Sequence, residues 1–432
     1  MTNRVIAVSL GAAIALLGAL GSNSGTFMAA GPEHPNVVIE WNQTMLDTFA
    51  TAGVPPPPGN RLGGIVQSAV FDAVNGIELR YSAIHVQPAA PADASPQAAA
   101  VNAAYTVLVG LFPGQKASLD IALAASIAEL QDDEDGASMA SGLVWGKTVA
   151  NQTMAWRATD GFNAPAPPYS FGTMPGQWQP TPGGSGAPKF QQLATTAPFA
   201  LTSPSQFRPT GPPLLTSAAY TASFNEVKAY GGLTSTVRTL FQTETARFWQ
   251  LDTPTAMWDR VADSLAVEKH LNLLSTARLL AQVDDAIADA SFAIWDAKVA
   301  FNFWRPMTAI VNAGIDGNPD TSPDLTWQPL MTTPYFQEYP SAHSGVSSAA
   351  AYILASTFGQ DTSFNVTSAG LPGVTRTFDS FQSGVNQVAD ARVFAGFHFR
   401  FSCNEAITLG SNVGAYVYAH LIRPAGDSDA VS

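Results

Sequence analysis

The chain has 432 residues, of which 46% are hydrophobic and only 12% charged, so it can bury a large core and is not a disordered polypeptide. Its 33 acidic residues outnumber its 20 basic residues, and the net charge of −13 with no long basic stripe excludes a protein that binds nucleic acid by neutralising phosphates. Cys403 is the only cysteine, which excludes an intrachain disulfide.

The N-terminus has the pattern of an export signal. Arg4 precedes the apolar run 5–20, and small residues follow with a cleavage position near Ala29 or Ala30. The run is shorter than the ~20 residues of a spanning helix, although a retained membrane anchor is the alternative. We expect 1–30 to be a signal peptide and the protein to be exported, periplasmic or extracellular, with no membrane partner after cleavage.

The remainder of the chain is predicted to be mostly helical. Ser95 is a typical N-cap residue and Pro96 a typical first helical residue, so a helix is expected over 97–112. Helical patterns also cover the ranges 119–130, 142–157, 217–230, 235–250, 255–304, 344–358, 380–394 and 404–420. Little alternating strand pattern is present, and the length allows one large or two moderate helical domains.

The segment 163–215 differs from its surroundings. It holds about a dozen prolines, many glycines and isolated aromatic residues such as Trp178, which excludes a regular helix. A flexible linker is one interpretation, but the aromatic residues favour a packed covering segment.

Three short segments in the C-terminal half carry cationic and histidine side chains. In the first, Lys298 and Arg305 lie seven residues apart, so on one helix they would project from the same face about 10 Å apart, and Pro306 would end or kink that helix. Trp295 would lie on the same face. Two solvated cations beside a core tryptophan are the alternative.

The second segment, Pro340 to Ser344, precedes a predicted helix of small residues. Backbone N–H groups and the Ser341 hydroxyl would collect at the helix N-terminus, which is a natural anion site. His343 in the first turn is placed to transfer a proton. A plain helix cap with a satisfied histidine is the alternative.

The third segment contains Arg392 and His398. Six residues apart on an unbroken helix, their side chains would diverge by about 120°. Gly396 offers a break that lets both turn toward one centre. Together, the three segments provide the cations and donors that a tetrahedral oxyanion needs.

The order and spacing of these segments resemble three motifs of the vanadium-dependent haloperoxidase and type 2 phosphatidic acid phosphatase superfamily. KVAFNFWRP resembles its Lys, six residues, Arg-Pro motif, PSAHS its Pro-Ser-Gly-His motif, and ARVFAGFHFRFS its Ser-Arg, five residues, His motif. The stretch Arg61 to Ile77 is similar to the bacterial haloperoxidase-like branch. The resemblance implies an all-α fold of two helical bundles, over 31–162 and 216–425, with the oxyanion site in the second.

The resemblance also implies roles for individual residues. His398 would bind the vanadium of vanadate, and His343 would be the acid–base residue. Lys298 would polarise bound peroxide. The oxyanion ligands carried over from the family are Lys298, Arg305, Ser341, the backbone of Ala342, Arg392 and His398. Hydrogen peroxide and halide would be the substrates, with a small organic acceptor, and a homo-oligomer stays open.

The chain departs from the family pattern at three positions. Ala342 replaces a glycine, Ala391 replaces a serine, and Ser402 replaces the aspartate that supports the apical histidine. Because this aspartate orients a ligating histidine, Ser402, Glu405 or a distant carboxylate would have to replace its function.

Two aromatic residues favour one activity within the superfamily. Trp295 and Phe336 resemble the halide pocket of chloroperoxidase-type members, which predicts a haloperoxidase. One alternative is a secreted acid phosphatase in which His398 forms a phosphohistidine and His343 protonates the leaving group. A catalytically weakened anion-binding protein is the second alternative, and Ser402 is the feature that supports it.

Overall fold

The computed structural model describes residues 36–132, 134–166 and 168–426, and most of them are helical. The α-helices of these residues are α1 (Val37–Ala52), α2 (Pro56–Glu78), α3 (Pro96–Leu111), α4 (Lys116–Gln131), α5 (Gly136–Ala158), α6 (Ala218–Tyr230), α7 (Leu240–Gln250), α8 (Pro254–Glu268), α9 (Leu273–Phe301), α10 (Pro306–Val311), α11 (Ala342–Phe358), α12 (Phe381–Phe394) and α13 (Arg400–His420). The shorter elements are the 3-10 helices η1 (Pro113–Gln115), η2 (Gln191–Thr195) and η3 (Ala313–Ile315) and the strands β1 (Phe364–Thr367) and β2 (Thr375–Phe378). The predicted helical fold is confirmed, whereas the predicted signal peptide lies outside the described residues.

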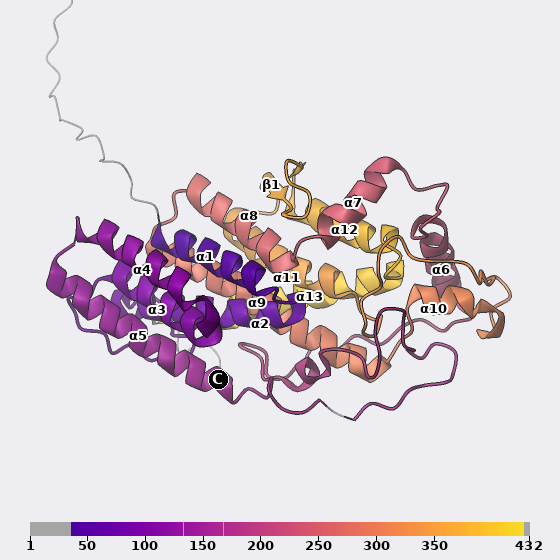
Figure 1. Ribbon diagram of the computed structural model, residues 1–432, viewed down its shortest axis with the longest axis horizontal. Helices are drawn as coiled ribbons and strands as arrows, with labels where there is room; N and C mark the ends of the chain where they lie inside the picture. The colour runs from indigo at the N-terminus through magenta and orange to yellow at the C-terminus, as the bar shows by residue number, and fades with distance from the viewer. Residues whose placement is uncertain (1–35, 133, 167, 427–432) are drawn as a thin grey trace, which may run out of the picture. The chain divides into compact units, whose positions relative to one another are not determined.

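Helix α9 is the buried centre of the described fold. Nearly all of its residues from Leu274 to Lys298 are buried, including several aspartates, so neighbouring segments cover every side of the helix. Helices α2, α8, α11 and α13 pack against it (Figure 1). One buried apolar cluster includes residues of both 31–162 and 216–425, and the division into two bundles at these ranges stays a prediction.

Capping residues explain where several helices begin. Ser95 caps α3, and Pro96 is the first residue of that helix, as predicted. Helix α7 begins later than the predicted Ser235 because Thr239 and Gln242 form a capping box that sets its first turn. Local hydrogen bonds of the N-cap residue therefore decide these boundaries.

The single long helix predicted over 255–304 is wrong. The chain breaks between α8 and α9, where His270 has a positive φ of 52° and the Asn272 side chain accepts a hydrogen bond from Ser275 to cap α9. Helix α9 then ends at Asn302, whose φ of 46° is left-handed. Pro306 consequently begins α10 instead of ending α9.

The irregular segment 163–215 packs over the C-terminal end of α9. Trp178 is fully buried, and its backbone N–H donates to the carbonyl of Asn302 at 2.7 Å. Gln177 forms an isolated antiparallel bridge with Phe303. The aromatic residues of this segment therefore lie against the helix that carries the first cationic segment.

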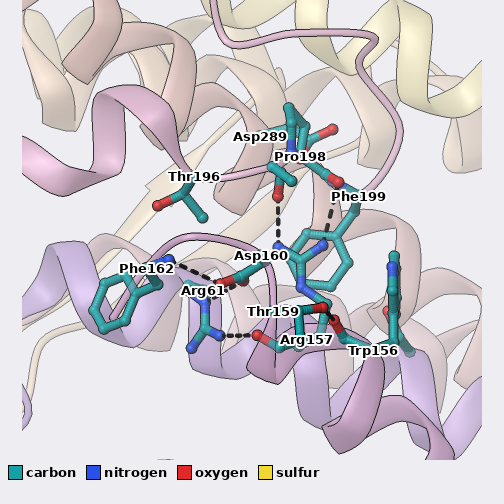
Figure 2. A network of polar contacts seen from close by, with 12 residues as sticks. Arg61, Trp156, Arg157, Thr159, Asp160, Phe162, Thr196, Pro198, Phe199 and Asp289 are labelled. Carbon is teal, nitrogen blue, oxygen red and sulfur yellow. Dashed lines mark hydrogen bonds and ion pairs between the residues drawn. The ribbon is translucent and has the colours of Figure 1, made fainter. Parts of the chain in front are cut away.

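A buried charge network joins this cover to α2, α5 and α9 (Figure 2). Asp160 pairs with Arg61 at 2.6 Å and with Arg157 at 2.8 Å, and Arg157 donates to the carbonyl of Ala197 at 2.6 Å. Asp289 of α9 accepts three backbone N–H groups of the cover at 2.6, 2.8 and 2.9 Å. This network was not predicted from the sequence, because most of its members lie far apart along the chain.

The antiparallel hairpin of β1 and β2 was also not predicted. Each strand has four residues with alternating burial, and Phe364 pairs with Phe378 in its register. Both rings pack inward, and Phe364 also stacks on Phe381 with 4.9 Å between ring centroids.

Within the described ranges, no single helix is long and apolar enough to span a membrane. Helix α3, taken together with η1 and α4 across a sharp bend, reaches the required length and hydropathy by length and composition alone.

Candidate active site

The three predicted segments meet in the fold, where α9, α10, α11, α12 and the turn before α13 converge. The predicted residues occupy the last two turns of α9 (Trp295, Lys298), the N-cap of α10 (Arg305), the segment before α11 (Phe336), the start of α11 (Ser341, Ala342, His343), the last turn of α12 (Arg392) and the turn before α13 (His398). Direct contacts prove the convergence: Arg305 donates to the carbonyl of Phe397 at 3.0 Å, and the backbone N–H of Ser341 donates to the carbonyl of Ser402 at 3.2 Å.

Lys298 is held by backbone carbonyl groups. Its ammonium group donates to the carbonyls of Gln337, Glu338 and Pro340 at 2.9, 2.8 and 2.6 Å, and the side chain is fully buried. Burial, and then the charge of Arg305, lowers the pKa of Lys298 well below its ordinary value. In this arrangement, the lysine fixes the segment 337–340 against α9 and directs all three of its N–H groups to that segment.

Arg305 reaches the centre of the site from the N-cap of α10 and not from α9. Its Nε donates to the carbonyl of Phe336 at 2.8 Å, and its Nη1 lies 3.1 Å from Nε2 of His398. Burial lowers the pKa of Arg305 to about 10, so the guanidinium stays charged at neutral pH. Its Nη2 is buried without a hydrogen-bond partner among the described residues.

His398 contacts a carboxylate that the sequence analysis missed. Its Nδ1 lies 2.9 Å from Oε1 of Glu338, which also accepts the backbone N–H of Phe399 at 3.0 Å. Burial raises the pKa of Glu338 to about 7. Burial and then Arg305 lower the pKa of His398 well below its ordinary value, so the ring is neutral at neutral pH.

A weak sequence signal for Glu338 did exist. The residue stands three positions before Ser341, beside the second motif. An acidic residue next to an anion site repels the anion, so its presence there indicates a specific partner. Ser402 and Glu405 were the candidates named from the sequence. In the hydrogen bonds of the described residues, neither of them reaches His398.

Helix α12 and the turn after it position the third segment as predicted. Gly396 has a φ of 80°, a left-handed conformation that favours glycine, and it separates Arg392 from His398. Arg392 donates from Nη1 to Oε1 of Gln250 at 2.5 Å, while its Nε is buried without a partner among the described residues. Burial lowers the pKa of Arg392 to about 9.

The start of α11 forms the more open side of the site. Ser341 is the N-cap of α11, and its hydroxyl lies 3.0 Å from that of Ser344. Ala342 and His343 are only partly buried, as is Phe336, whereas Lys298, Arg305, Arg392 and His398 are buried. Desolvation, and then the charges of Arg392, Lys298 and Arg305, lower the pKa of His343 well below its ordinary value.

The predicted aromatic pair lies beside Lys298. The rings of Trp295 and Phe336 are 5.1 Å apart between centroids, and the ammonium nitrogen of Lys298 lies 5.8 and 5.3 Å from them. The guanidinium carbon of Arg305 lies 4.9 Å from the Phe336 ring. The cationic cradle therefore has an apolar, aromatic wall.

The donor set fits an oxyanion and not a metal cation. Arg305 Nη2 and Arg392 Nε are buried N–H donors that lack partners in the described part of the chain, and buried donors of this kind are stabilised by a bound anion. The backbone N–H groups at the start of α11 add a helix N-terminus. Within the described ranges, no group of three or more His, Cys, Asp or Glu side chains is placed to hold a metal ion.

Comparison with known proteins agrees with this geometry. Residues 278–426 match the family model described as the VCPO second helical-bundle domain. A vanadium chloroperoxidase of Curvularia inaequalis is 30% identical over 181 residues, a match that covers 35% of this chain and only 29% of that protein.

Solved structures resemble most of the chain. A bacterial vanadium-dependent iodoperoxidase has a TM-score of 0.75 and 25% identity over 90% of this chain and 98% of its own. The holo form of a bacterial vanadium-dependent chloroperoxidase has a TM-score of 0.68 and 19% identity over 84% of this chain and 91% of its own, and shows the same fold. Residues 278–426 therefore match the second helical-bundle domain of the vanadium chloroperoxidase family, and the fold as a whole is similar to that of bacterial vanadium-dependent haloperoxidases.

Proposed function

We propose that this protein is a vanadate-dependent haloperoxidase that oxidises halide with hydrogen peroxide to a hypohalous acid equivalent. The observation that carries the proposal is the arrangement around His398. Its Nε2 faces the guanidinium of Arg305, next to a cradle of buried N–H donors and to the aromatic pair Trp295 and Phe336. An oxyanion cofactor and a weakly hydrated halide both suit such a site.

Vanadate would be held by the side chains of Arg305, Arg392 and His398 and by the N-terminus of α11, with Ser341 and Ala342. When bound, vanadate supplies the activation of hydrogen peroxide toward a halide. Lys298 contributes positive charge and fixes the segment 337–340, because its own hydrogens point to three carbonyls.

The chain's own residues handle the proton and the halide. His343 is neutral at neutral pH and partly exposed, so its ring nitrogen can accept a proton from hydrogen peroxide as it enters. Trp295 and Phe336 offer an apolar wall that excludes water around the halide. In the overall reaction, the halide loses two electrons, the O–O bond breaks, one oxygen forms the hypohalous acid and the other leaves as water after taking up a proton.

A phosphatase of the same superfamily is the second candidate. The observation in its favour is the neutral His398 with its Nε2 directed at Arg305, because such a nitrogen can also attack a phosphoryl group that two arginines hold. His343 would then protonate the leaving group.

Parallel assays separate the two activities. The purified protein is incubated with vanadate, hydrogen peroxide and iodide, bromide or chloride, with monochlorodimedone as the trap for oxidised halogen, and p-nitrophenyl phosphate hydrolysis is followed without vanadate. We expect halogenation that needs vanadate and is lost in His398→Ala but retained in His420→Ala, since His420 is exposed on α13. Phosphate release without halogenation would overturn the proposal.

We also propose two further features. The export signal over 1–30 would place the enzyme in the periplasm or outside the cell, where peroxide and halide are available. A small organic molecule would accept the oxidised halogen.

A further inference from the structure

We propose that Glu338 is the positioning residue that sets the tautomer and ring orientation of His398, and that it replaces the aspartate that the third motif lacks at Ser402. The inference rests on the proposed function, because it assigns His398 the task of binding the vanadium of vanadate.

The contacts of His398 determine which ring nitrogen carries the proton. Arg305 can only donate, so Nε2 of His398, 3.1 Å from Nη1 of Arg305, must be the acceptor. The neutral ring then carries its proton on Nδ1, which donates to Oε1 of Glu338 at 2.9 Å. Both ends of the ring therefore require the same tautomer, in which the Nε2 lone pair faces the anion cradle.

Glu338 is held firmly enough to orient the ring. Its backbone N–H donates to the carbonyl of Phe303 at 3.0 Å, and its own carbonyl accepts from Lys298 at 2.8 Å. The backbone N–H of Phe399 donates to the same Oε1 that accepts from His398. Because the carboxylate is fully buried, water does not compete for these contacts.

Ser402 and Glu338 complement each other. The carbonyl of Ser402 accepts the backbone N–H of Ser341 at 3.2 Å, so position 402 lies against the same stretch of chain that carries Glu338. An aspartate at 402 would bring a second buried carboxylate to this region, where like charges repel each other. The carboxylate that contacts His398 therefore comes from the residues just before the second segment and not from the third segment.

Substitutions test this assignment in two ways. The first readout is the ¹⁵N spectrum of histidine-labelled protein without vanadate, which reports the tautomer of His398 directly. The second is the dissociation constant for vanadate, followed by ⁵¹V NMR. In E338A we expect mixed tautomers and vanadate affinity lower by about 10- to 100-fold, the usual effect of losing a residue that orients a metal ligand.

The double variant E338A/S402D is the decisive rescue. It places a carboxylate four residues after His398, and we expect it to restore the Nδ1–H tautomer and to tighten vanadate binding at least about fivefold relative to E338A. E405Q is the matched control. Glu405 lies on α13, the helix that carries Ser402, and has no hydrogen bond to His398 among the described residues. The tautomer of His398 and the vanadate affinity should therefore stay at the wild-type level.

Each result decides the inference separately from the proposed function. An unchanged tautomer and unchanged vanadate affinity in E338A would overturn it, as would a double variant no better than E338A. If E338A does not fold, E338Q replaces it, with an expected loss of about threefold in vanadate affinity because a neutral oxygen accepts more weakly than a carboxylate, and no loss would overturn the inference. If these effects appear but the wild-type protein oxidises no halide, the proposed function fails and the role of Glu338 stands.

Discussion

At the scale of single residues, the site depends on charged groups that are buried with defined partners. Lys298 is the clearest case, because three backbone carbonyls accept its hydrogens and the side chain is fully buried. A buried cation of this kind costs desolvation energy and persists only where such partners are fixed. The lysine is consequently both part of the positive cradle and a structural connection between α9 and the segment before α11.

Replacement of Lys298 tests this double role. We expect Lys298→Met to lower the free energy of unfolding by at least about 3 kcal/mol, since three carbonyls lose a charged donor. Urea denaturation followed by circular dichroism measures the effect, and the exposed Lys147→Met is the control. Wild-type stability in Lys298→Met would contradict the structural role.

The low pKa of His343 predicts the acid side of the pH profile. The ring must be neutral to accept a proton, so halide oxidation should persist as the pH falls and decline only below the ordinary histidine pKa of about 6.5. In His343→Gln, the rate of halide oxidation should be lower than in the wild-type protein, and the decline at acidic pH should be absent. Steady-state rates from pH 4 to 8 provide the measurement, and a decline centred above 6.5 in the wild-type protein would contradict the assignment.

At the scale of elements, the irregular cover is held by buried charge pairs and hydrogen bonds that involve none of the residues of the anion site. Asp160, after α5, pairs with Arg61 of α2 and Arg157 of α5, while Asp289 of α9 accepts backbone N–H groups of the cover (Figure 2). A proline-rich segment has few backbone hydrogen bonds of its own. These contacts therefore fix where it lies against α9.

Removal of Asp160 should release this junction. We expect Asp160→Ala to destabilise the fold by about 3–5 kcal/mol, because two buried arginines lose their carboxylate. The control is Glu268→Ala, which breaks the solvent-exposed pair with Lys269 and should leave the unfolding midpoint almost unchanged. If both variants unfold at the wild-type midpoint, the network does not stabilise the cover.

At the scale of the whole molecule, the core around α9 contains more carboxyl groups than cations to pair with them. Asp259 and Asp284 are fully buried, and none of their carboxyl oxygens has a hydrogen-bond partner among the described residues. Burial, and then neighbouring carboxylates, raise the pKa of both well above the ordinary value. Burial also raises the pKa of Asp263 to about 7 and that of Asp289 to about 6.

These raised pKa values predict a stability that decreases with rising pH. The folded protein keeps protons that the unfolded chain releases near pH 4, so the contribution is complete below pH 4 and is lost as the pH rises through about 6 to 7. Urea denaturation at pH 5 and pH 8 should show lower stability at pH 8. Asp263→Asn should reduce this difference and the exposed Asp361→Asn should not, whereas greater stability at pH 8 would contradict the prediction.

The sequence alone determined the features whose signals are local. Helical patterns, the N-cap Ser95 and the break at Gly396 each depend on neighbouring residues, and the three segments, with their resemblance to known motifs, predicted an oxyanion site with an aromatic pair. The position of Arg305 differs from the prediction of one helix through Lys298 and Arg305. The left-handed Asn302 ends α9 earlier, and Arg305 is the N-cap of α10.

Only the tertiary structure decided which distant groups meet. Glu338 lies 60 positions from His398, and Asp160 lies 99 positions from Arg61, so no periodicity connects either pair. Hydrogen bonding and burial act through space, and the packing around α9 brings these groups within contact. The same packing directs the hydrogens of Lys298 to backbone carbonyls, a role that depends on neighbours and not on residue type.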